Sequence, residues 1–195
     1  MEPITRFEGL AAPLALDNVD TDQIIPARFL RKPRDADYQR WLFHDLRFAP
    51  DGSPLPGFVL NRPPFDAATI LVAGRNFGVG SSREAAVYAL QAFGIRAVIA
   101  ESFGDIHYSN ALKNGLLPIR LPPERVRALR EAAEGGGLRL TVDLERCVVA
   151  SPDGAEDPFA VPAFARDCLL RGLDEIGLTL THLPEIEAFE ARHAV

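Results

Sequence analysis

The chain has 195 residues, 47% of them hydrophobic and 25% charged, and its 21 basic and 27 acidic residues give a formal net charge of −6. This composition is typical of a soluble single-domain protein, no apolar run approaches the roughly 18 residues of a membrane span, and the N-terminal segment lacks the basic flank of a signal peptide, so we expect a cytoplasmic location and no membrane contact. The acidic balance argues against nucleic-acid binding, because phosphate contacts require clustered Lys and Arg.

The first third of the sequence is expected to consist mostly of loops, because Asp, Gly and Pro recur from residue 17 to residue 64. Segment 38–48 is the exception, and its pattern predicts a short helix that buries Trp41, Leu42 and Phe48. Three aspartates lie between residues 17 and 22. Asp and Asn are common turn formers, so composition alone favours a structural role for this cluster over a cation site.

The pattern becomes regular from residue 69. Residues 69–73 form a short, continuously apolar run that predicts a strand buried on both faces. A helix is expected from residue 81 until Gly94 stops it, and a second buried strand over 97–100. This order is that of a βαβ unit, whose two strands are parallel and joined by a right-handed crossover.

The remaining segments complete an α/β fold with a mixed sheet. A short helix is expected over 108–114, followed by the apolar run 116–121 and a helix that opens at Pro122 and ends near Gly135. Alternation over 138–142 and 147–150 predicts half-exposed antiparallel strands. From about residue 161 the chain is expected to be helical, over 164–171 and again over 184–192.

The segment GRNFGVGSSRE, residues 74–84, is the strongest candidate for a ligand-binding loop. Its glycines permit positive φ angles, and the helix that follows presents free N–H groups that favour an anion. Arg83 lies where the helix dipole disfavours a cation, which makes sense if its guanidinium grips a carboxylate or a phosphate. Because Arg83 stands where the dinucleotide fingerprint requires a third glycine, a small carboxylate is favoured over a nucleotide.

A purely structural interpretation of the same loop stays open. Ser81 and Glu84 satisfy the S-x-x-E capping-box pattern, which would tie the Ser81 hydroxyl to the backbone. His107 has no partner visible in the sequence and is expected to be a packed histidine. Cys147 and Cys168 lie in apolar segments and are expected to be inert core thiols, too few to hold a metal or a cluster alone.

Over nearly its whole length the chain resembles the small subunit of bacterial 3-isopropylmalate dehydratase, in the aconitase superfamily. The matching segments include NVDTDQIIPARFL (18–30), NFGVGSSRE (76–84), SFGDIHYSNALKNGLLPIRL (102–121) and GLDEIGLTL (172–180). The resemblance implies an aconitase swivel-type fold with β/β/α layers. Residues 1–195 would form one swivel domain with a C-terminal helical extension from about residue 161.

The resemblance also implies a hydro-lyase that acts only as a heterodimer of a small and a large subunit. The reaction would interconvert 2-isopropylmalate and 3-isopropylmalate through isopropylmaleate, in leucine biosynthesis. The large subunit would hold a [4Fe–4S] cluster, so no cofactor or metal is expected on this chain. The ligand would be a small branched dicarboxylate bound where the two chains meet.

Carried over by position, the family motif makes Ser81 the catalytic base and Arg83 the residue that binds a substrate carboxylate. Gly80 and Ser82 would line the substrate site beside them. An unactivated serine is too weak a base at neutral pH, so its alkoxide would need stabilisation by Arg83 and the helix N-terminus.

The resemblance also reverses the structural interpretation of the aspartate cluster. It predicts supporting positions behind the substrate-binding residues for Asp20, Thr21 and Asp22. The loop over residues 25–34 becomes the candidate for recognition of the isopropyl group.

Three positions depart from the family pattern and leave alternatives open. Val79, Ala85 and Val87 stand where bacterial relatives usually carry Cys, His and Pro. The substrate could therefore be another branched malate, either citramalate/citraconate or 2,3-dimethylmalate. A non-catalytic swivel module that binds a carboxylate or a partner is the alternative from another functional class.

Overall fold

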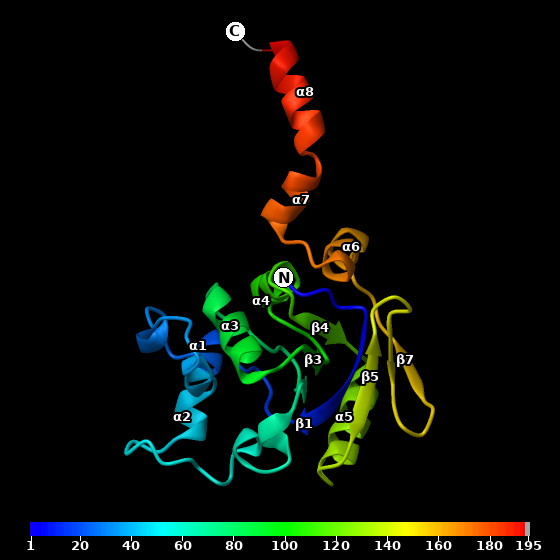
Figure 1. The fold of residues 1–195 in the computed structure, drawn as a ribbon. Helices are drawn as coiled ribbons and strands as arrows, with labels where there is room; N and C mark the ends of the chain where they lie inside the picture. Colours follow the sequence, from blue (N-terminus) through cyan, green and yellow to red (C-terminus); the bar gives the residue numbers. More distant parts are fainter. Residues whose placement is uncertain (194–195) are drawn as a thin grey trace.

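A seven-stranded mixed sheet forms the centre of the molecule in a computed structural model that describes residues 1–193 (Figure 1). The strands are β1 (Arg6–Pro13), β2 (Ile70–Val72), β3 (Ala97–Ala100), β4 (Leu117–Arg120), β5 (Arg139–Asp143), β6 (Val148–Ala150) and β7 (Glu156–Pro158). Their spatial order is β4-β3-β2-β1-β5-β6-β7. β1 to β4 are mutually parallel, whereas β5, β6 and β7 join them in antiparallel fashion. The predicted α/β class with a mixed sheet is confirmed.

The described residues also form eight α-helices. They are α1 (Thr21–Ile24), α2 (His44–Arg47), α3 (Glu84–Phe93), α4 (Asp105–Lys113), α5 (Pro123–Ala133), α6 (Ala163–Arg171), α7 (Glu175–Thr181) and α8 (Leu183–His193). No described helix has the length and apolar character needed to cross a membrane.

Side chains of β2 alternate between two hydrophobic cores. Leu71 packs in the core that contains Val87 and Leu90 of α3, while Ile70 and Val72 pack in the core that contains Val126 of α5. A strand that contributes to both cores must be apolar at every position. This explains why the run over 69–73 could be recognised from the sequence.

Three expectations need correction. Segment 38–48 is not one helix: a 3₁₀ turn covers Tyr38–Trp41, and α2 follows after Phe43 adopts a left-handed φ of 48°. Neither β1 nor β7 was predicted, although β1 lies between β2 and β5 in the sheet. The two cysteines are half-buried rather than core thiols, and Cys147 precedes β6 with a φ of 54°.

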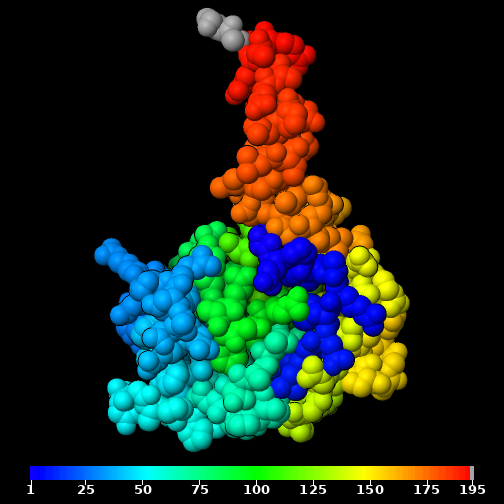
Figure 2. Space-filling view, in the orientation of Figure 1, coloured from blue at the N-terminus to red at the C-terminus, as the bar shows by residue number. Residues whose placement is uncertain are grey.

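The last two helices project from the body of the molecule. Figures 1 and 2 show α7 and α8 in orange and red, extending away from the sheet beyond α6. Neither helix contains a buried residue. The helical character predicted for the C-terminal region is confirmed as far as residue 193.

Candidate active site

The glycine-rich loop follows β2 and is held by a second loop from the first third of the chain. The Gly78 N–H donates to the Val19 carbonyl at 2.7 Å, and the Thr21 N–H donates to the Val79 carbonyl at 2.9 Å. Asp20 and Val79 form an isolated parallel bridge. These backbone contacts place the aspartate cluster and the glycine-rich loop side by side, although they lie far apart in the sequence.

Gly78 fits where no other residue could. Its φ is +73°, and a Cβ built on it would lie 2.3 Å from Cγ of His107, on α4. Gly80 also has a positive φ of +99°, but a Cβ there would meet Asp20 and Thr21 only at 3.7 Å. The loop is therefore pressed onto His107 at Gly78 and open to solvent at Gly80.

Ser81 does not cap the helix, so the capping-box interpretation is wrong. α3 begins three residues later, at Glu84, with an extended Arg83 as its N-cap residue and no side-chain cap bond. Ser81 is exposed, and no hydrogen-bond partner for its hydroxyl is found within residues 1–193. Its main-chain carbonyl accepts a hydrogen bond from the Thr21 hydroxyl at 2.9 Å. The backbone of Ser81 is thus fixed while its hydroxyl is available for chemistry.

Arg83 is paired with Asp22. Nη1 of Arg83 lies 2.6 Å from Oδ1 of Asp22, and Nη2 donates to Oδ2 at 3.2 Å. The Arg83 side chain is only 16% exposed, against 56% for Asp22. The hydrogen bond from Arg83, together with one from the Ala27 N–H, lowers the pKa of the Asp22 carboxyl below its usual value. Asp22 is therefore a carboxylate at neutral pH and orients the guanidinium.

Asp20 has a structural role that the sequence pattern already contained. It is the N-cap of α1, where the Gln23 N–H donates to Oδ1 of Asp20 at 2.7 Å and the Asp20 N–H donates to the Gln23 side chain at 2.9 Å. This capping box fixes the start of α1 and so places Thr21, which is buried, and Asp22 against the glycine-rich loop.

The acidic cluster does not form a metal site. Asp17 pairs with Arg75 at 3.2 Å, while Asp20 caps α1 and Asp22 binds Arg83, so the three carboxylates face different partners. Throughout residues 1–193, no group of three or more His, Cys, Asp or Glu side chains is positioned to hold a metal ion.

The segment expected to recognise the substrate side chain divides into core and surface positions. Ile25 and Phe29 are buried, and Phe29 stacks on Trp41 with ring centroids 4.2 Å apart. Leu30 is 39% exposed. The guanidinium of Arg34 lies 3.5 Å from the ring centroid of Tyr88, on α3. Of the large hydrophobic side chains between residues 25 and 34, Leu30 is the one that is exposed.

Sequence reasoning missed Arg47, which holds together the segments around residues 39–42 and residue 61. It is buried, and burial lowers its pKa to about 10. Its guanidinium donates to the carbonyls of Gln39 and Leu42 and to the side chain of Asn61. Segment 38–48 contains two arginines, Arg40 and Arg47, and no local pattern distinguishes the buried one from the exposed one.

Three models of protein families match successive parts of the chain. Residues 1–124 match the aconitase C-terminal domain and residues 127–163 a model described as LeuD_N. Residues 175–195 match the C-terminal domain of the small subunit of 3-isopropylmalate dehydratase.

Curated relatives and a solved structure give the same result over the full length. A 3-isopropylmalate dehydratase small subunit of Cereibacter sphaeroides is 51% identical over 97% of this chain and 95% of its own length. The small subunit of Ruegeria pomeroyi is 48% identical over 100% and 97%. The crystal structure of a 3-isopropylmalate dehydratase from Methanocaldococcus jannaschii superimposes with a TM-score of 0.67 at 26% identity, covering 97% of this chain and 100% of that one.

Proposed function

The chain belongs to the family of 3-isopropylmalate dehydratase small subunits in the aconitase superfamily, and on that premise we propose that its glycine-rich loop completes the active site of a two-chain hydro-lyase. The reaction interconverts 2-isopropylmalate and 3-isopropylmalate through isopropylmaleate, in leucine biosynthesis. The observation that carries the proposal is the arrangement of Arg83, oriented by Asp22, near the Ser81 hydroxyl, which makes no hydrogen bond within residues 1–193.

Arg83 binds a carboxylate of the substrate. Nη2 donates to Asp22, whereas Nη1, although 2.6 Å from the same carboxylate, has no hydrogen-bond partner among the described residues, so donors of the guanidinium remain for a second carboxylate. The side chain is largely buried, so a carboxylate bound there would be shielded from water and its ion pair strengthened. The exposed residues Gly80 and Ser82 flank this position and leave room for the substrate.

Ser81 moves the proton. In dehydration it takes a proton from the carbon adjacent to the one that carries the hydroxyl, and in hydration it returns the proton. Serine is a weak base, so its alkoxide requires nearby positive charge. Arg83 and the free N–H groups at the start of α3 supply that charge, because both lie within three residues of Ser81.

The Lewis acid for the departing hydroxyl would come from the large subunit, through the [4Fe–4S] cluster that we place there. Residues 1–193 offer no ligand set for a cluster, since Cys147 lies in the turn before β6 and Cys168 in α6, both half-buried. Those free thiols also favour a reducing compartment, and a cytoplasmic location is part of the proposal.

Leu30 is the proposed contact for the isopropyl group. It lies on a loop whose first residues are fixed to Asp22, because the Ala27 N–H donates to the Asp22 carboxylate. The same carboxylate binds Arg83, so Asp22 links the loop to the arginine that is proposed to bind the substrate. As the exposed large hydrophobic side chain of that loop, Leu30 can cover a branched alkyl group. We also propose that residues 1–195 form a single swivel domain with the C-terminal helices as an extension.

The test is a substrate panel. The chain is co-expressed with a large subunit from a relative and assayed anaerobically by the absorbance of the unsaturated acid, with isopropylmalate, citramalate and 2,3-dimethylmalate in parallel. We expect kcat/KM to be highest for isopropylmalate. A preference for citramalate or dimethylmalate would support the hydro-lyase reaction but contradict isopropylmalate as the substrate. Formation of a complex that turns over none of the three would contradict the catalytic role of this loop.

A further inference from the structure

The C-terminal arm, defined here as α7 and α8, exposes large apolar side chains. Ile176 is 72% exposed, Leu180 58% and Phe189 57%. Figures 1 and 2 show the arm standing clear of the rest of the chain, so the body of the molecule does not cover these residues. A cluster of exposed apolar side chains on a projecting helix is typical of an interaction surface.

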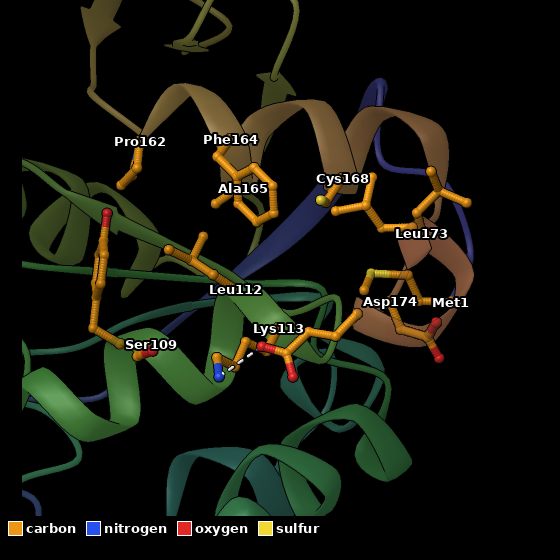
Figure 3. A pocket seen from close by; sticks show the side chains of 13 residues that line it. Met1, Ser109, Leu112, Lys113, Pro162, Phe164, Ala165, Cys168, Leu173 and Asp174 are labelled. Carbon is orange, nitrogen blue, oxygen red and sulfur yellow. Dashed lines mark ion pairs between the residues drawn. The ribbon is translucent and has the colours of Figure 1, made fainter. Parts of the chain in front are cut away.

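The base of the arm is anchored, which fixes the direction in which its apolar face points. Lys113 Nζ of α4 lies 2.8 Å from Glu175 Oε1, and Leu178 lines a cavity of about 290 Å³ between α4, α6 and α7 (Figure 3). Ile176 and Leu180 are each two residues from Leu178, about 200° around a helix. They therefore point away from the body when Leu178 packs against it.

The charge of the arm argues against a second copy of the same arm as its partner. α8 carries Glu185, Glu187 and Glu190, with Arg192 as its one Lys or Arg. Two arms packed together would bring carboxylates against carboxylates, and like charges brought together at an interface are unfavourable. The surface that fits the arm is apolar in its middle and carries Lys or Arg at its rim.

The family comparison indicates which chain provides that surface. The aconitase C-terminal domain model ends at residue 124, whereas the arm has a model of its own, described as belonging to small subunits of 3-isopropylmalate dehydratase. The arm thus accompanies chains that work with a separate large subunit. We propose that it docks on the large subunit, with Ile176, Leu180 and Phe189 as the apolar contacts; this inference rests on the proposed function.

The experiment measures the dissociation constant for the large subunit separately from turnover. The variant Ile176→Ser/Leu180→Ser changes only exposed side chains, so the fold should survive, and circular dichroism checks this. The matched control is Leu55→Ser, a 38%-exposed leucine in the loop after α2, at the opposite end of the molecule from the arm (Figure 1). Binding is measured by anaerobic titration in low and high salt, and kcat at saturating large subunit.

We expect the double variant to raise the dissociation constant at least tenfold and to keep the wild-type kcat once the complex is saturated, while Leu55→Ser binds like wild type. High salt should weaken wild-type binding, because the arm is acidic. Wild-type affinity in the double variant would overturn the proposal. So would an isolated wild-type dimer that the double variant converts to a monomer, since the occupant would then be a second copy. A wild-type chain that does not bind the large subunit would instead contradict the proposed function itself.

Discussion

Asp22 holds the guanidinium of Arg83 through two contacts, at 2.6 and 3.2 Å, across a separation of 61 residues. The carboxylate comes from α1, which the Asp20 capping box starts, and the arginine from the residue just before α3. The pair therefore couples two loops and aims the guanidinium of the proposed site. Because Asp22 is more than half exposed, the ion pair contributes little to the stability of the fold. Its main effect is to orient the guanidinium of Arg83.

Asp22→Asn should lower kcat/KM by about tenfold while the melting temperature stays nearly unchanged. The amide keeps the shape of the side chain but loses the charge that fixes the guanidinium, and misplacement of a binding group costs rate more than stability. Steady-state kinetics of the assembled enzyme and thermal unfolding of the isolated chain measure the two quantities. A large loss of thermal stability with unchanged kinetics would show that the pair is only structural.

Ser81→Ala should abolish turnover, by about a thousandfold or more, without loss of stability or of affinity for the large subunit. The Ser81 hydroxyl makes no hydrogen bond within the described residues, so folding loses nothing when it is removed. Ser82→Ala is the matched control, an adjacent exposed serine that should retain most of the activity. The opposite ranking of the two variants would assign the base to Ser82.

The failure of the capping-box pattern shows where local sequence reasoning ends. Ser81 and Glu84 have the right spacing, but Arg83 keeps an extended backbone with φ −140° while its side chain bonds to Asp22, so the helix starts later. The sequence around Arg83 does not reveal that its side chain bonds to Asp22, 61 residues earlier in the chain. The resemblance to a family named Ser81, Arg83 and Asp22 as candidate site residues, and their roles stay predictions. The structure shows only that the chain brings these residues together.

A strand could be predicted from the sequence where all of its consecutive side chains are apolar and buried. Ile70–Val72 is apolar on both faces and was recognised, whereas β1 contains Gly9 and ends at Pro13, residues that sequence patterns assign to loops. Gly9 is required because a Cβ there would lie 2.2 Å from Thr69 Oγ1, on the segment that leads into β2. The close approach of two strands is a property of the sheet and cannot be recognised in either strand alone.

His107 should make the isolated chain less stable as the pH falls from about 6.5 to about 4. Burial lowers its pKa to about 4 from 6.5, and neither ring nitrogen has a partner in the described residues. Between these pH values the unfolded histidine is protonated and the folded one is neutral, so the unfolded state binds more protons. Folding stability from this group is then fully present above pH 6.5 and falls by about 3 kcal/mol toward pH 4.

Urea unfolding of the wild type and of His107→Phe across this pH range isolates the effect. Phenylalanine keeps a planar ring beside Phe77 without a titratable group; its larger size changes the stability by the same amount at every pH, so the part of the pH slope that belongs to His107 should vanish. The carboxyls whose pKa values are lowered, Asp22, Asp45, Asp51 and Glu156, begin to lose their contributions near pH 4 in both proteins alike, so the difference between the two slopes belongs to His107. Identical slopes in the two proteins would show that His107 titrates normally.

Gly78→Ala and Gly80→Ala form a matched pair that tests how tightly the loop is pressed onto α4. Both glycines have positive φ, which costs an alanine about 1 kcal/mol. A Cβ at Gly80 meets its neighbours at 3.7 Å, so Gly80→Ala should lose little more than that. A Cβ at Gly78 would lie 2.3 Å from His107, so Gly78→Ala should lose clearly more stability and displace the loop that carries Ser81.

The double variant Gly78→Ala/His107→Ala separates the steric cost from the conformational cost. Removing the imidazole relieves the contacts of the new methyl group with the ring atoms Cγ and Cδ2, at 2.3 and 2.4 Å, but alanine keeps the Cβ of residue 107 at 2.7 Å. The double variant should therefore be more stable than the sum of the two single losses predicts, by about 1 kcal/mol, while part of the steric cost remains. Urea unfolding of all four proteins gives this coupling energy, and simple additivity would mean that the imidazole does not set the position of the loop.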